Sequence, residues 1–166
     1  MANSMTILVS AVYIAASLTL PSLQPAGAET LSPALQTDGV IKVKSAYPVD
    51  ETIARIKQDI AAKGIKFFDE IDQTKLATDS GIKLRPSTLL VFGNPPLGIQ
   101  FITSNPNAGL DWPVRLLVRQ DETGTVWAVY TEFAWIAHRF GVKDREAQFQ
   151  MASTVIGSIT ASVAAK

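Results

Sequence analysis

The sequence predicts an α+β fold: a single domain with an antiparallel sheet, helices packed on one face of that sheet, and the element order β-α-β-β-β-β-α. Three observations lead to this prediction. Segments with strand-like patterns follow one another through the middle of the chain, and two of them form a hairpin. Segments with helical apolar spacing stand at both ends of this series, and short helical inserts interrupt it. Helices grouped outside a run of strands are typical of α+β folds, whereas regular alternation indicates α/β folds.

The first half of the domain begins with a strand and a helix. Residues 40–47 alternate apolar and polar side chains, which is the pattern of a half-buried strand. Residues 49–60 repeat large apolar side chains at helical spacing, with Pro48 at the entry and Gly64 placed to cap the end. The same reasoning predicts three further elements: a strand at 65–71, a short helix at 72–80 stopped by Gly81, and a continuous apolar strand at 87–92.

The second half contains a hairpin and closes with a long helix. Residues 97–103 are predicted to form a short helix before the Asn-Pro break at 105–106. The hairpin pairs residues 114–120 with 125–131 across a turn in which Gly124 can adopt positive φ. Two more helices follow, a short one at 133–140 and a long one from about residue 144 with an apolar stripe of Phe149, Ala152, Ile156, Ile159 and Val163.

The first 28 residues have the pattern of a secretory signal peptide. Residues 7–20 are apolar or small throughout, which is shorter than the roughly 20 residues that a spanning helix needs. Ala26 and Ala28 supply the small residues of a cleavage site. We therefore expect cleavage before Glu29, a flexible arm at 29–39, the domain at 40–166, and a periplasmic or secreted protein without stable membrane insertion. An uncleaved anchor is the alternative, because no Lys or Arg precedes Ile7.

Composition narrows the classes of function. The chain has 15 basic and 15 acidic residues and is formally neutral, which argues against nucleic acid as a partner, since such proteins concentrate positive charge. It contains no cysteine, so thiol catalysis and cysteine-ligated metals are excluded. His138 is the only histidine, and we interpret it as a surface or helix-end residue. We therefore predict no metal site and no cofactor.

Catalytic motifs such as G-x-S-x-G, H-E-x-x-H and the P-loop are absent from the sequence. Two acidic clusters, Asp69-Glu70 with Asp72 and Asp121-Glu122, are interpreted as solvated strand-end and turn residues. Asp111 lies between Gly109 and Pro113, beside Trp112. Two roles remain open for it: a partly buried acid or base, or a structural carboxylate that accepts backbone N–H groups of a tight loop, which is the role we prefer.

Two segments resemble a known family. Residues 84–95, LRPSTLLVFGNP, are similar to the block LRPTTLLIFGNP of the family called domain of unknown function 302, and residues 108–113, AGLDWP, are similar to its AGLDLP. The resemblance implies a compact α+β domain of TATA-binding-protein-like topology and a homodimer, and it implies no established activity. Members of the family often carry His at the position of Gln73, and His or Tyr at the position of Phe140. If other members use these positions for acid–base or metal chemistry, we do not expect that role in this chain.

We therefore predict an exported binding or interaction module without catalysis, whose partner is an unknown small molecule or an envelope protein. The candidate binding residues are Arg85, Asn94, Asp111 and Trp112; Trp127 and Trp135 are interpreted as core or interface. The alternative is a small metal-independent enzyme in which Asp111 acts as acid or base near Arg85 and Asn94.

Overall fold

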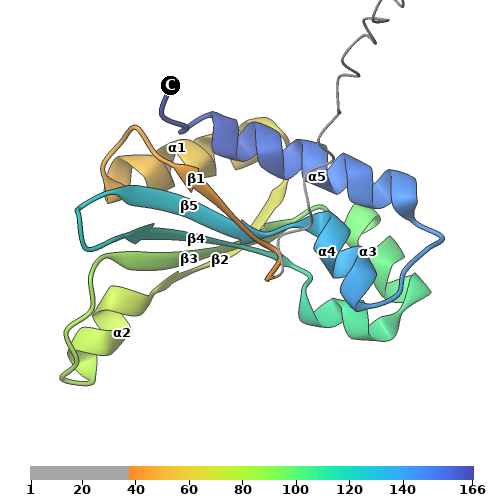
Figure 1. Ribbon diagram of the computed structural model, residues 1–166, viewed down its shortest axis with the longest axis horizontal. Coiled ribbons are helices and arrows are strands. Elements are labelled where there is room, and N and C mark those ends of the chain that lie inside the picture. The colour runs from red at the N-terminus through yellow and green to blue at the C-terminus, as the bar shows by residue number, and fades with distance from the viewer. Residues whose placement is uncertain (1–37) are drawn as a thin grey trace, which may run out of the picture. The chain divides into compact units, whose positions relative to one another are not determined.

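The computed structural model describes residues 38–166, and Figure 1 shows how their elements are arranged. The predicted signal peptide and nearly all of the arm at 29–39 lie outside the described residues. Five strands form one antiparallel sheet in the order β1-β5-β4-β3-β2. The strands are β1 (Val40–Lys44), β2 (Lys66–Asp72), β3 (Ser87–Gly93), β4 (Val114–Gln120) and β5 (Val126–Thr131). The α+β class, the antiparallel sheet and the element order are confirmed.

The helices fall into three groups around the sheet (Figure 1). The long helices α1 (Val49–Ala62) and α5 (Glu146–Ala161) lie over the same face. At one end of the sheet, α2 (Gln73–Asp79) projects from the β2–β3 connection and buries none of its residues. The remaining helices gather at the other end: α3 (Pro95–Ser104), the 3₁₀ helix η1 (Pro106–Leu110) and α4 (Phe133–Arg139).

The core lies between the sheet and the two long helices. Alternate residues of the central strands face these helices because side chains of a strand point to opposite faces in turn. Leu90, Leu116 and Ala128 are fully buried in this way, and α1 and α5 contribute the predicted stripes that include Ile56 and Ile159. The residues on the other side of the same strands are half-exposed, among them the in-register row Leu89, Leu117 and Val129.

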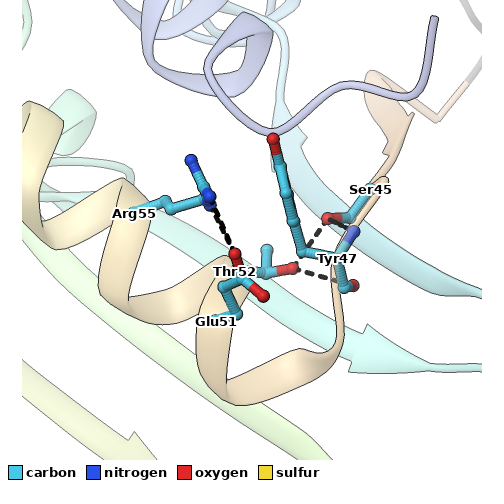
Figure 2. A network of polar contacts seen from close by, with 5 residues as sticks. All are labelled: Ser45, Tyr47, Glu51, Thr52 and Arg55. Atoms are coloured by element: carbon cyan, nitrogen blue, oxygen red, sulfur yellow. Dashed lines mark hydrogen bonds and ion pairs between the residues drawn. The ribbon is translucent and has the colours of Figure 1, made fainter.

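The first strand ends at Lys44, three residues earlier than the alternation predicts, because a buried polar junction follows it (Figure 2). The hydroxyl groups of Ser45 and Thr52 are 2.7 Å apart, and Thr52 donates to the carbonyl of Tyr47. The Ser45 hydroxyl also accepts the Tyr47 N–H, which starts the turn into α1. The Ala46 N–H donates to the carbonyl of Val163. The segment at 163–165 therefore runs beside the last residues of β1.

Two Asn-Pro pairs that look like simple breaks in the sequence are helix starts in the structure. Asn94 caps α3, which begins at Pro95, two residues earlier than expected, and Asn105 caps η1, which the sequence did not predict. In each case the asparagine side chain accepts a backbone N–H of the first turn. Proline suits the first position of a helix because its missing N–H would have had no partner there.

A candidate ligand-binding cleft

An apolar cleft of about 360 Å³ opens between α5 and the end of the sheet that carries α3. We call it the Trp112 cleft. Its walls come from elements far apart in the sequence: β3 and the loop after it, α3, the start of β4, and one face of α5. Aromatic and aliphatic side chains form most of its lining, namely Ile65, Phe92, Leu97, Phe101, Trp112, Val114, Phe133, Met151, Val155 and Ile156.

The Trp112 ring packs against the backbone of two glycines in the wall of the cleft. A Cβ atom placed on Gly98 would lie 1.7 Å from the indole Nε1, and one on Gly93 would lie 3.2 Å from it. The ring therefore rests on the backbone of α3 at a position where no larger residue fits. Phe68, from the bulge in β2, meets the indole edge to face with 6.1 Å between ring centroids. This packing fixes a large flat apolar surface at the cleft.

Polar groups are few and lie at the margins of the cleft. Asn94 lines it next to Gly93, and its side-chain oxygen caps α3. Lys63, at the end of α1, contributes a cation that is paired with both carboxylate oxygens of Asp59 at 2.7 Å. Ser158 and Thr154 add hydroxyl groups from α5. An apolar hollow with a few polar groups at its rim is the usual form of a small-molecule site.

Asp111 has a different environment from the one expected. Its side chain is 6 % exposed, and its two carboxylate oxygens accept from Arg115 at 2.6 Å and from Arg139 at 2.8 Å. The expectation that backbone N–H groups of its loop hold the carboxylate is therefore wrong. Arg139 comes from α4, so the carboxylate joins the start of β4 to a helix 28 residues further along the chain. Because each oxygen already accepts a charge-assisted hydrogen bond, we expect the group to act as a structural clamp.

The four predicted binding residues do not meet in one place. Asn94 and Trp112 line the same cleft. The carboxylate of Asp111 is held by its two arginines beside a small separate recess. Arg85 precedes β3 whereas Asn94 follows it, so the two residues stand at opposite ends of a seven-residue strand. At about 3.3 Å per residue this separation is roughly 20 Å or more, and Arg85 lies in another hollow of the surface.

The remaining candidates occupy the positions that the sequence predicts. His138 is exposed in the last turn of α4. Asp69 pairs in register with Val91 and Glu70 with Leu90, so the two carboxylates leave opposite faces of β2, and Glu70 forms an exposed ion pair with Lys57. Asp121 lies in the turn between β4 and β5, as the sequence predicts.

Asp121 accepts more hydrogen bonds than an ordinary turn residue. Its carboxylate accepts from the Trp127 indole N–H at 2.7 Å, from the Thr123 hydroxyl and from the N–H groups of Thr123 and Thr125. These bonds, that of Trp127 above all, lower the pKa of Asp121 to about 2.

The sequence contains one local sign of the cleft, although it belongs to no known motif. Gly98 stands in the middle of α3 among apolar residues, and a glycine inside a helix often marks a close approach of another group. The other cleft residues come from β3, β4 and α5, whose convergence no local pattern reveals. Among the helices of residues 38–166, none is both long enough and apolar enough to cross a bilayer.

The fold and the cleft together define a class: a small α+β domain in which a helix-backed antiparallel sheet carries an apolar hollow at one end. Residues 41–159 match the family described as domain of unknown function DUF302, and the chain belongs to that family. A crystal structure of an uncharacterized conserved DUF302 protein from Bacillus stearothermophilus is similar to this chain, with a TM-score of 0.69. The similarity covers 75 % of this chain and 98 % of that protein at 16 % identity, and it supports the fold alone.

Curated relatives include proteins named as ion channels. Over 101 residues the chain is 35 % identical to the fluoride-specific ion channel FluC 1 of Brucella suis and to the fluoride-specific ion channel FluC 2 of Brucella melitensis. The matched segment covers 61 % of this chain, but only 40 % and 37 % of those two proteins. The chain thus spans about two-fifths of the length of these relatives.

Proposed function

We propose that this protein is an exported binding module that holds a small, mainly apolar organic molecule in the Trp112 cleft and performs no catalysis on it. The single observation that carries the proposal is the cleft itself. Its apolar surface stays open to solvent although burying such surface is favourable by roughly 25 cal/mol per Å². The placement of Trp112 on Gly98 and Gly93 supplies a preformed wall, so a ligand would bind with little cost of reorganisation.

The chemistry of the lining also bears on the relation to the Brucella channels. Fluoride is a small, strongly hydrated anion, and taking it out of water requires several hydrogen-bond donors or cations. The Trp112 cleft offers mostly carbon atoms, and Lys63, the one cation among its lining residues in the part of the chain that the structure describes, is already paired with Asp59. We therefore infer that the segment shared with those channels provides a binding function for an organic ligand, separate from any handling of fluoride.

We further propose export after cleavage between Ala28 and Glu29, and assembly as a homodimer. The apolar run and small residues of the first 28 positions support the former, and intact-mass analysis of periplasmic protein tests it. The half-exposed row Leu89, Leu117 and Val129 supports the latter, since such a row suits contact with a second copy. Sedimentation equilibrium tests it, and a purely monomeric protein at high concentration would exclude it.

The alternative of an enzyme that uses Asp111 near Arg85 and Asn94 has weaker support. It needs the three groups around one substrate, whereas Arg85 stands at the far end of β3 from Asn94. It also needs a carboxylate that faces a substrate, whereas the Asp111 side chain is 6 % exposed and each of its oxygens already accepts a hydrogen bond from an arginine.

The experiment is a titration with N-phenyl-1-naphthylamine, a neutral apolar dye that fluoresces when it leaves water. We expect saturable binding of one dye per chain. Ser158→Phe places a ring at the rim of the cleft from an exposed position, so it should weaken dye binding at least tenfold. Ala161→Phe is the matched control, because Ala161 is exposed on the same helix but does not line the cleft.

Two outcomes would contradict the proposal. Non-saturable uptake of several dyes would indicate a general apolar surface and no defined site. Equal affinities of Ser158→Phe and the wild-type protein would place the dye elsewhere. Thermal unfolding of both variants checks that any lost binding does not result from a damaged fold.

A further inference from the structure

A second hollow lies at the other end of the sheet from the Trp112 cleft. It has a volume of about 520 Å³ and is formed by two segments, residues 83–87 before and at the start of β3, and residues 119–122 at the end of β4 and in the hairpin turn. Three of its lining side chains are basic: Lys83, Arg85 and Arg119. We call this hollow the basic recess.

The two walls of the basic recess are joined by the sheet. Ser87 pairs in register with Arg119, and the Gln120 N–H donates to the carbonyl of Pro86 at 2.9 Å. Thr74 of α2 also fixes the entry to β3, because its hydroxyl accepts the Ser87 N–H at 2.8 Å. The backbone that carries Arg85 and Arg119 is therefore held in place before any ligand binds.

The three cations of the basic recess are not paired with carboxylates, unlike most arginines in the described part of the chain. Arg55, Arg115, Arg139 and Arg145 each form an ion pair with a carboxylate. Within residues 38–166, neither Arg85, Arg119 nor Lys83 has a carboxylate within ion-pair distance, and their side chains make no hydrogen bond to the protein. Like charges around one hollow repel each other, so an anion between them would be favoured.

Two acidic residues also line the basic recess, and neither neutralises it by a direct bond. The oxygens of Asp121 are occupied by the indole of Trp127 and by Thr123 and Thr125, which also keep this carboxylate ionised by lowering its pKa. Glu122 is exposed in the turn. With three basic and two acidic side chains, the lining keeps one excess positive charge. The N–H groups of its cations remain available to a ligand, whereas the oxygens of Asp121 already accept hydrogen bonds from the protein.

We propose that the basic recess binds a multivalent oxyanion, through Arg85 and Arg119 with support from Lys83. A guanidinium group presents parallel N–H donors that fit two oxygens of one phosphoryl or carboxyl group. Two such groups with a flanking ammonium match an anion of two or three charges, and the volume accommodates a molecule of the size of pyrophosphate or citrate. This site is distinct from the Trp112 cleft, and the proposal does not depend on the function proposed for that cleft.

The test is isothermal titration calorimetry of the purified protein at low ionic strength with two probes, inorganic pyrophosphate and citrate. We expect saturable 1:1 binding of at least one probe, and the tighter probe identifies the phosphoryl or the carboxyl chemistry. Arg85→Gln and Arg119→Gln should each weaken this binding at least tenfold. Arg55→Gln is the matched control, since it removes the same charge from an exposed pair on α1 and should leave the affinity unchanged.

Several results would overturn the proposal. Neither probe giving saturable heat up to millimolar concentration would mean that the recess holds no such anion. An equal loss of affinity in Arg55→Gln would mean that binding follows net charge and not this site. Wild-type affinity in both recess variants, with their fold verified by thermal unfolding, would place the anion elsewhere. Dye binding in the Trp112 cleft should persist in Arg85→Gln, which separates the two sites.

Discussion

Replacing Gly98 by alanine tests how tightly Trp112 is held. The new Cβ would lie 1.7 Å from the indole Nε1, 2.1 Å from Cε2 and 2.3 Å from Cδ1, so three atoms of the ring must move by more than an ångström. Overpacking of this kind costs about 1–3 kcal/mol. Alanine in a helix interior returns about 0.5–1 kcal/mol relative to glycine. We expect a net loss of about 1–2 kcal/mol in the free energy of unfolding, which is a fall of roughly 3–10 °C in Tm for a domain of this size.

Urea denaturation at neutral pH measures the effect, and two further variants isolate its cause. Gly157→Ala in α5 is the matched control, because a Cβ there meets nothing within 4 Å and the helix preference alone should raise stability. In a Trp112→Ala background, Gly98→Ala should become neutral or stabilising, so the two positions should be coupled by about 1–3 kcal/mol. If Gly98→Ala is as stable as Gly157→Ala, the indole moves without cost and the cleft wall is not preformed.

Two more predictions concern carboxylates that the structure places in hydrogen-bonded settings. Asp111→Ala should lower the free energy of unfolding by about 1–2 kcal/mol, a modest value because Arg115 and Arg139 are half-exposed and regain water; an unchanged urea midpoint at pH 7 would refute the clamp. The Asp121 carboxylate should stabilise the fold above pH 4, since its folded pKa of about 2 lies below its ordinary value, and this contribution should be lost as the pH falls toward 2. The stability difference between the wild-type protein and Asp121→Asn should shrink over that range, and a constant difference down to pH 2 would contradict this reasoning.

Most elements of this domain are predictable from local patterns of apolar and turn residues. The apolar stripes of α1 and α5 are both present in the structure with the expected faces buried. Errors occur where side chains compete with the backbone. Ser45 ends β1 early by bonding with Thr52, and Asn94 and Asn105 start helices where the sequence suggested only breaks.

The candidate sites are less predictable because their members come from distant parts of the chain. The sequence draws attention to Asp111, but its partner Arg139 is 28 residues away and no spacing rule connects them. Arg85 and Asn94 are close in sequence, yet an extended strand separates them in space. Only Gly98 carried a local sign of the Trp112 cleft, since a glycine amid apolar helix residues has no advantage unless another group approaches it.

The segment that follows α5 lies beside β1, and this placement matters for protein engineering. Ala165 donates its N–H to the carbonyl of Lys44, while the described domain enters β1 at Val40, so both ends of the domain flank one edge strand. Their separation is about four strand residues, or roughly 13 Å. A short linker can therefore join them, and new termini can be opened in the exposed turn at Glu122 and Thr123. The same geometry allows the described domain to be inserted into a surface loop of a host protein whose two ends lie about as far apart.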